Sequence, residues 1–387
     1  MRFVVPAVVM LGLLISLTAN AGRVGRNWWR ALTPGHSGVG PNVFAAAYAV
    51  FAVAVLALTV ACRLPAVRLP GPAVTAVHVG LAVLMFTVVI ANVFALALWL
   101  ARLIRLVPRP LPPPVGLAAL AVTGALVAGL TAYGAVHAAT LRDRAYDLVV
   151  TGPASSADQL DVALISDTHL GAILGADFLG RVVDRVNALN PDVVLIAGDV
   201  FDGDFDALAD PDAIRAQFAR LRAPDGVFAC LGNHDAGRGA AAMAALLESA
   251  GVRVLRDEAV QVGDRFVVAG RRDSSPIGGT EDARRQPLPR WTAEQSGLPV
   301  IVLDHQPSNI GEYGEPVDLV VCGHTHGGQI FPGNLIVASL FDAAYGYFQA
   351  TPDAPQVVTT SGVGTWGPPL RIASDSEVVH LRLTVGH

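Results

Sequence analysis

The first 141 residues contain no Asp or Glu, and this feature restricts the possible folds of the chain more than any other. Nine Arg are their only charged side chains, whereas the rest of the chain holds all 32 acidic residues and the other basic ones. An apolar part without acids therefore precedes an acidic part that suits water. The sequence predicts two regions that meet different solvents.

Four uncharged apolar stretches lie in the first region. Each is long enough to cross a hydrocarbon core about 30 Å thick, which takes roughly 20 helical residues. A helix satisfies its own backbone hydrogen bonds inside lipid, so helices are the expected structure. The sequence therefore predicts an all-α transmembrane bundle over residues 1–141, with helices at about residues 3–21, 43–62, 73–101 and 115–139.

The first stretch also permits a second interpretation. Arg2, the apolar run after it and Ala19-Asn20-Ala21 resemble a cleavable signal peptide. We favour a span, because three further spans already provide membrane attachment. The first and third loops together carry six Arg, one more than the opposite side. The positive-inside rule thus favours an extracytoplasmic second region by one Arg, a margin that the terminal amine cancels.

From residue 158 onward, apolar runs of strand length alternate with amphipathic helical patterns. This alternation predicts an α/β layered domain over residues 158–387, preceded by a linker over residues 142–157. The expected strands include Val162–Ile165, Val193–Ala197, Val227–Leu231, Val300–Leu303, Leu319–Cys322 and Val378–Leu383, and the expected helices are Asp177–Leu189, Pro211–Leu221 and Ala240–Ala250.

Composition excludes two classes of partner or site. The acidic second region lacks the clustered positive charge of a large nucleic-acid footprint, so no nucleic-acid partner is expected. Only three Cys occur, without CxxC spacing, which argues against a disulfide framework and against a thiolate zinc site.

Five short polar blocks each follow an expected strand, where ligands of open α/β sheets gather. They are Ser166–His169, Gly198–Asp202, Gly232–Asp235, Asp304–Pro307 and Gly323–Gln329. They supply Asp, His and Asn and hold half of the ten His of the chain. Such ligands suit divalent ions of borderline hardness, for example Mn²⁺, Fe or Zn²⁺.

In this order the five blocks, DxH, GDxxD, GNHD, DHxP and GHTHGGQ, resemble the motifs of the calcineurin-like metallophosphoesterase superfamily. The GHTHGGQ form and the closing run Ser361–Arg371 resemble its membrane-associated bacterial branch. The resemblance covers about residues 158–385. It implies a four-layer αββα sandwich in which two mixed sheets face each other and metals lie at one edge. The implied activity is hydrolysis of a phosphate ester, with phosphodiesters favoured, by a hydroxide that two metal ions activate.

The resemblance also implies a role for individual residues. One ion would be held by Asp167, His169, Asp199 and His326, and the other by Asp199, Asn233, His305 and His324. Asp199 would bridge the ions by offering one oxygen to each. His234 would be a catalytic residue rather than a ligand, and Asp235 would orient its ring. Many members of the branch have Glu where this chain has Asp235, whose side chain is shorter, so this position departs from the pattern of the branch.

Two residues and the substrate stay open at this point. Asp202 is expected to hold a loop or support a ligand His rather than to contact substrate. Arg371 could clamp a substrate phosphate or pair with an acid, and the sequence favours neither. The expected partners are a bilayer and a phosphate ester, for which membrane location suggests a lipid-linked or envelope-derived molecule. The sequence leaves the oligomeric state open.

Overall fold

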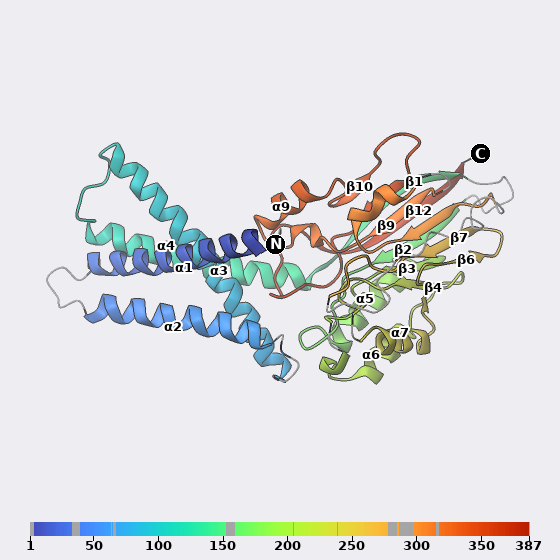
Figure 1. Ribbon diagram of the computed structural model, residues 1–387, viewed down its shortest axis with the longest axis horizontal. Coiled ribbons are helices and arrows are strands. Elements are labelled where there is room, and N and C mark those ends of the chain that lie inside the picture. The colour runs from blue at the N-terminus through green and yellow to red at the C-terminus, as the bar shows by residue number, and fades with distance from the viewer. Residues whose placement is uncertain are drawn as a thin grey trace. The chain divides into compact units, whose positions relative to one another are not determined.

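The computed structural model describes residues 4–32, 39–62, 64, 67–151, 159–203, 205–237, 239–277, 285, 297–314 and 317–386, with side chains from residue 12 onward except that of Thr151 (Figure 1). It divides into two compact units, Met1–Gly134 and Ala135–His387. The parts of our predictions that fall on residues 1–3, 152–158 and 387 lie outside the described residues.

Helices occupy all four predicted apolar segments of the first unit. They are α1 (Val4–Leu32), α2 (Val39–Ala61), α3 (Gly71–Leu103) and α4 (Pro113–Ala139). Among the described residues, α2, α3 and α4 are long and apolar enough to cross a membrane. The Asn20 side chain donates a hydrogen bond of 2.8 Å to Asn92 Oδ1, which ties α1 to α3. Buried Trp28 adds an apolar contact inside this helical unit.

The second unit contains two mixed six-stranded sheets. The first sheet has the order β1 (Leu141–Thr151), β12 (Ser376–Gly386), β2 (Gln159–Ile165), β3 (Val193–Ala197), β4 (Val227–Cys230) and β5 (Arg253–Val254). The second has the order β10 (Gly346–Phe348), β11 (Gln356–Thr359), β9 (Leu319–Cys322), β8 (Val300–Leu303), β7 (Phe266–Gly270) and β6 (Glu258–Val262). β12 runs parallel to β1 and antiparallel to β2.

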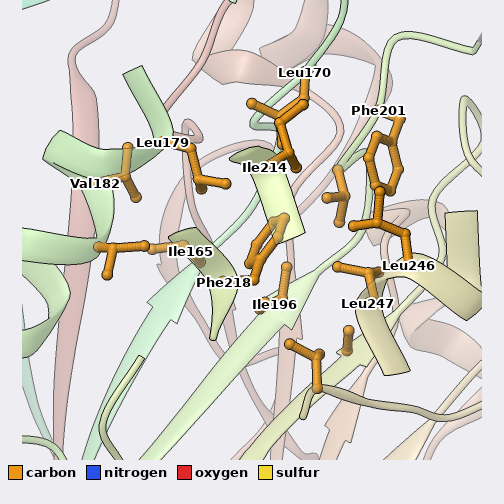
Figure 2. Close-up of a cluster of buried hydrophobic side chains, with 14 of the residues drawn as sticks. Ile165, Leu170, Leu179, Val182, Ile196, Phe201, Ile214, Phe218, Leu246 and Leu247 are labelled. Carbon is orange, nitrogen blue, oxygen red and sulfur yellow. The ribbon is translucent and has the colours of Figure 1, made fainter. Parts of the chain in front are cut away.

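Alternating side chains of each strand fill two different cores. In β2, Val162 and Leu164 face the core between the two sheets, where they meet residues of the second sheet such as Ile301. Ala163 and Ile165 face the opposite side, as the two-residue period of a strand requires. That side is covered by α5 (Ala176–Ala188), α6 (Pro211–Phe218) and α7 (Ala240–Ser249) (Figure 2).

The outer face of the second sheet carries a smaller core. It includes Val302, Val320 and Tyr313, the last of which follows the 3₁₀ helix η2 (Pro307–Glu312). Two mixed sheets with helices outside confirm the predicted fold class.

The predicted linker needs a correction. Residues 142–157 are expected to connect the two regions, but residues 141–151 form strand β1 and pair with β12 along its whole length. The strand was not predicted because its sequence contains several charged residues. An edge strand such as β1 tolerates them, since part of it is exposed to solvent. One of them, Asp147, accepts hydrogen bonds of 2.6 and 2.9 Å from Arg382 on β12.

Candidate active site

The predicted ligand residues follow strands whose carboxyl ends meet at one edge of the sandwich. β2, β3 and β4 run parallel in the first sheet, and β8 and β9 run parallel in the second. Parallel strands end at the same edge, so the side chains that follow them gather there. The structure brings together all seven predicted metal ligands: Asp167, His169, Asp199, Asn233, His305, His324 and His326.

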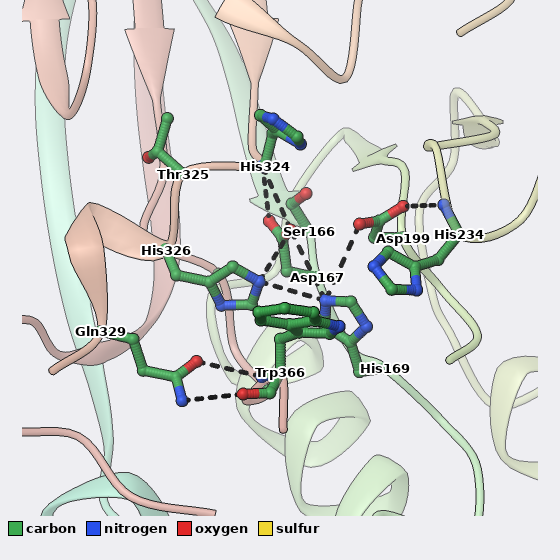
Figure 3. A network of polar contacts seen from close by, with 12 residues as sticks. Ser166, Asp167, His169, Asp199, His234, His324, Thr325, His326, Gln329 and Trp366 are labelled. Carbon is green, nitrogen blue, oxygen red and sulfur yellow. Dashed lines mark hydrogen bonds and ion pairs between the residues drawn. The ribbon is translucent and has the colours of Figure 1, made fainter. Parts of the chain in front are cut away.

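One group consists of Asp167, His169 and His326 (Figure 3). The Nε2 atoms of the two imidazoles lie 3.1 Å apart, and their rings are stacked with an interplanar angle of 24°. Asp167 Oδ1 lies 3.4 Å from His326 Nε2 and 3.9 Å from His169 Nε2. Two imidazole nitrogens and a carboxylate oxygen thus face one point, an arrangement that a divalent cation satisfies.

The second group contains His305, His324 and Asn233. Asn233 Oδ1 lies 3.1 Å from His305 Nε2 and 2.9 Å from His324 Nδ1. His305 Nδ1 lies 2.8 Å from the carbonyl oxygen of Ala197, which can only accept, so this nitrogen carries a proton and donates. That bond fixes the ring and turns Nε2 towards the other ligands, as partners of metal-bound His usually do.

Asp199 lies between the two groups. Its Oδ2 is 3.1 Å from His305 Nε2 and 3.8 Å from His169 Nε2, whereas its Oδ1 accepts a hydrogen bond of 2.9 Å from the backbone N–H of His234. The predicted position of Asp199 between both groups agrees with this geometry. The resemblance implied that each oxygen of Asp199 would face one ion. In the structure, Oδ2 alone faces both groups.

Burial and charge act together on these ligands. Burial opposes ionisation of Asp199, but His305 outweighs it, so the pKa of Asp199 falls below its ordinary value. Burial likewise opposes charge on His305, yet Asp199 raises the pKa of that ring. The Asp199 carboxylate therefore favours a positive charge next to it, here on the His305 ring. Burial, reinforced by His305, lowers the pKa of His324 to about 4, which leaves its ring neutral near pH 7, as a metal ligand must be.

The backbone at the site is strained. Five predicted ligands have left-handed φ angles: Asp167 (54°), His169 (44°), Asp199 (49°), His324 (73°) and His326 (52°). Non-glycine residues in this region cost on the order of 1–3 kcal/mol each and cluster where function requires a fixed geometry. The donor types, their convergence and this strain all fit a metal centre.

Gly323 allows two blocks to approach each other. A Cβ atom at this position would lie 2.0 Å from Ser166 Oγ and 2.3 Å from Asp167 Oδ2. Any other residue would therefore separate the first block from the last one.

His234 and Asp202 lie beside the first ligand group. The His234 ring stands edge-on to His169, with ring centres 4.9 Å apart. Asp202 Oδ1 lies 3.6 Å from His169 Nδ1 and 3.7 Å from His234 Nδ1. Asp202 is thus placed to support both imidazoles, which agrees with the favoured interpretation of this residue.

Asp235 does not have the position that the sequence suggests. Its Oδ2 accepts hydrogen bonds from the backbone N–H groups of Val200 (2.9 Å) and Gly232 (3.0 Å), and its Oδ1 accepts one from Phe201 (2.7 Å). Asp235 therefore joins the loops after β3 and β4, and Asp202 is the carboxylate beside the His234 ring. Burial, then the charge of Asp199, raises the pKa of Asp235 to about 7.

Arg371 is fully buried and holds the backbone of the site. Its guanidinium donates to the carbonyl oxygens of Ser361 (2.7 Å) and Gly364 (2.6 Å), to those of Gly362 (3.2 Å) and His326 (3.3 Å), and to Ser374 Oγ (2.7 Å). Burial lowers its pKa to about 10. Neither sequence-based alternative, a phosphate clamp or an acid pair, describes these contacts.

We expect Arg371→Met to lower the free energy of unfolding of the catalytic unit by about 3 kcal/mol, because buried carbonyl oxygens lose their donors. Denaturant unfolding of the purified chain in detergent measures this change. Arg382→Met, which removes an exposed pair with Asp147, is the control and should cost less than about 1 kcal/mol. If Arg371→Met kept its stability and lost only substrate affinity, Arg371 would be a phosphate clamp after all.

Two residues of the site were not singled out from the sequence. Gln329 Nε2 donates to the carbonyl oxygens of Trp366 and Pro368, each at 3.0 Å, and Gln329 Oε1 accepts from the backbone N–H of Trp366 at 3.0 Å. These bonds place the Trp366 indole 6.0 Å from the His234 ring (Figure 3). Both residues lie in motifs that carry the family resemblance, which is the signal that could have identified them.

Asp304 is a further supporting residue. Its carboxylate accepts hydrogen bonds from Arg285 (2.6 and 3.2 Å), from Tyr313 (2.5 Å) and from Asn309 (3.2 Å). These contacts fix the start of the segment that carries His305. Asp304 therefore supports the position of His305 and is not itself a candidate ligand.

The chain is similar in sequence to known metallophosphoesterases. Residues 160–328 match the family model of the calcineurin-like phosphoesterases. An uncharacterized metallophosphoesterase of Aquifex aeolicus is 33% identical over 258 residues, which cover 65% of this chain and 94% of that protein. An uncharacterized metallophosphoesterase of Helicobacter pylori is 31% identical, over 58% of this chain and 60% of that protein. Phosphodiesterase YaeI of Escherichia coli is 30% identical, over 44% of this chain and 61% of that protein.

The chain belongs to the calcineurin-like metallophosphoesterase family. It spans about 60% of the length of the Helicobacter pylori relative.

Proposed function

We propose that this chain is a membrane-anchored, metal-dependent hydrolase of phosphate esters that favours phosphodiesters. The observation that carries the proposal is the convergence of seven ligand side chains in two groups on either side of Asp199 Oδ2. The name of the similar Escherichia coli protein, a phosphodiesterase, supports the preference for diesters.

The two ligand groups suit two divalent ions. Asp167, His169 and His326 would hold one ion, and Asn233, His305 and His324 the other, with Asp199 shared. Imidazole and carboxylate ligands suit Mn, Fe or Zn. Such ions supply Lewis acidity, which activates water and neutralises phosphoryl oxygens.

His234 provides a movable proton at the same site. In the hydrolysis, an oxygen of water forms a bond to phosphorus, one P–O ester bond breaks, and the alcohol leaves with a proton. The His234 imidazole can donate that proton or bind a phosphoryl oxygen. The Trp366 indole, which is 48% exposed, lies beside this ring and is available for contact with a substrate.

The apolar helices anchor the enzyme as a multi-pass membrane protein. α2, α3 and α4 are three spans, and we assign α1 as a fourth. The margin of one Arg in favour of the first and third loops supports a catalytic unit outside the cytoplasm, which is the side that we propose. A lipid-linked or envelope-derived phosphate ester is then within its reach.

Metal removal tests the proposal. We expect about two metal equivalents in each chain, and we expect Mn²⁺ to restore hydrolysis of bis-p-nitrophenyl phosphate to the chelated protein. Elemental analysis and the rate of p-nitrophenol release are the measurements. His380→Asn is the control, because His380 bonds Asp161 on the first sheet, and it should retain both equivalents. Full activity in metal-free protein would contradict the proposal.

A further inference from the structure

Helix α9 (Gly333–Leu340) carries no charged residue, is mostly apolar and has no buried residue. Together with the preceding Phe331, it carries several exposed large apolar side chains of the catalytic unit. The exposed fractions are 57% for Phe331, 60% for Leu335, 55% for Ile336 and 69% for Leu340. A group of exposed apolar side chains of this kind marks a site of contact with another apolar phase rather than with water.

Both ends of α9 are held at the metal ligands. The helix follows η3 (His326–Gly328), which begins with a ligand, after four residues. The Gly333 N–H donates to the Ile330 carbonyl oxygen at 2.7 Å, which keeps this connection tight. At the other end, the Phe341 ring lies edge-on to ligand His324, with ring centres 5.9 Å apart. Whatever α9 contacts is therefore brought close to the site.

The sheet register relates the site to the last membrane span. Arg144 of β1 pairs with Val379 of β12, and Val379 pairs with Leu164 of β2, so these residues form one row across the sheet. Leu164 lies next to the end of β2, where the ligand residues begin. Arg144 is five residues beyond Ala139, the last residue of α4. At about 3.3 Å per residue, the row lies roughly 15 Å from the end of the span.

Helix α9 lies at this same end of the catalytic unit (Figure 1). The Arg144 guanidinium donates a hydrogen bond of 3.1 Å to the hydroxyl oxygen of Tyr345, five residues beyond α9. The start of β1, the end of β2 and α9 are thus neighbours. The end of α4, residues 135–139, belongs to the same unit, and the Ala138 carbonyl oxygen accepts a hydrogen bond of 2.9 Å from Ser376 Oγ at the start of β12.

We propose that α9, with Phe331 and the exposed Trp366, inserts into the interfacial layer of the bilayer that α4 crosses, so that the metal site acts on the phosphate ester of a membrane lipid. Exposed Phe and Leu side chains are stabilised when they are buried in this layer, which lies between headgroups and acyl chains, and Trp side chains are enriched there. The inference rests on the membrane anchoring and phosphoesterase activity proposed above, and it adds the docking surface and the substrate class.

Depth-dependent fluorescence quenching tests the docking. Cys62→Ser leaves the buried Cys230 and Cys322 as the remaining thiols, and an environment-sensitive dye is then attached to Leu335→Cys. The full chain is reconstituted in phosphatidylcholine vesicles that contain doxyl-labelled lipid. Dye at position 335 should emit at shorter wavelength and be quenched by the doxyl lipid. Val53→Cys in α2 is the positive control, and Asp212→Cys, at an exposed position of α6, is the negative control.

The three labels separate the possible results. Quenching at positions 53 and 335 supports the inference. If the dye at position 53 is quenched but the dye at position 335 behaves like the dye at position 212, the anchor is supported and the docking of α9 is overturned. No quenching at 53 overturns the anchor and the inference together. Disulfide-linked dimers formed through unlabelled Leu335→Cys, together with absent quenching at 335, would show that a second copy covers the helix, which also overturns the inference.

Hydrolysis separates the docking from the chemistry. The double variant Leu335→Ser/Ile336→Ser should hydrolyse bis-p-nitrophenyl phosphate at the wild-type rate, within about twofold. Its hydrolysis of phosphatidylglycerol in phosphatidylcholine vesicles should fall by about tenfold or more, because apolar area that favours the bilayer is lost. Val149→Ser, which removes an exposed aliphatic side chain of β1, is the matched control. If the double variant hydrolysed both substrates at the wild-type rate, the lipid assignment would be overturned. If the wild-type chain hydrolysed neither substrate, the proposed function would be overturned.

Discussion

Replacing Asp199 with Asn is expected to lower kcat/KM by more than about 10³-fold, a larger effect than the loss of any other single candidate ligand. Its Oδ2 is the oxygen that faces both ligand groups, so the variant disturbs both proposed ions at once. A loss of about 4 kcal/mol of transition-state stabilisation corresponds to three powers of ten in rate. Metal content should fall with activity, as elemental analysis and bis-p-nitrophenyl phosphate turnover measure.

Two comparisons make this result specific. Asp212→Asn removes one negative charge from the exposed surface of the same unit and should change neither metal content nor rate. His324→Asn removes a ligand of one group and should cost less than Asp199→Asn. If the two ligand variants lost the same activity and metal, the shared role of Asp199 would be wrong.

Replacing His234 with Gln is expected to lower kcat by roughly 10²–10⁴-fold while the metal content stays near normal, the usual range for loss of a positioned proton donor. The backbone N–H of His234, which donates to Asp199 Oδ1, is retained in this variant. Catalysis and metal binding are thereby separated. The measurements are steady-state kinetics and elemental analysis of the same preparation.

The leaving group distinguishes two roles of His234. If the ring protonates the departing alcohol, the loss should be small for p-nitrophenyl esters and large for alkyl esters. If it stabilises charge on the phosphoryl group, the loss should be large for both. Parallel loss of metal and activity would instead make His234 a ligand, a role that its proximity to His169 and Asp199 permits.

Short apolar runs made most of the catalytic sheet predictable. Buried strands such as β3 and β9 are uninterrupted runs of apolar residues, mostly Val, Leu and Ile, and the polar block after each marks where it ends. Edge strand β1 lacks this signal, because it is stabilised by a partner strand more than 200 residues away in the sequence. Local pattern cannot reveal such pairing.

Motif order led to seven candidate ligands, which the structure brings together, whereas it did not reveal the contacts of the supporting residues. Asp235 follows His234 directly, and this adjacency suggested that it orients the ring. The turn at residues 233–235 instead directs its carboxylate to the backbone of Val200, Phe201 and Gly232. Arg371 also carries a charge that suggested a phosphate or an acid as partner. Its partners are carbonyl oxygens, which no side-chain pattern encodes.

The position of β12 between β1 and β2 has a consequence for biosynthesis. β1 emerges from the ribosome directly after α4, but its partner is made after every other strand that the structure describes. Arg382 and Asp147, which join the two strands, are 235 residues apart, and pairing over such a separation forms slowly. Insertion of the helices into the membrane can therefore precede closure of the sheet. With the membrane anchoring that we propose, the nascent protein is held at the bilayer with β1 unpaired until β12 is made, and this is the stage at which a chaperone or a protease would meet it.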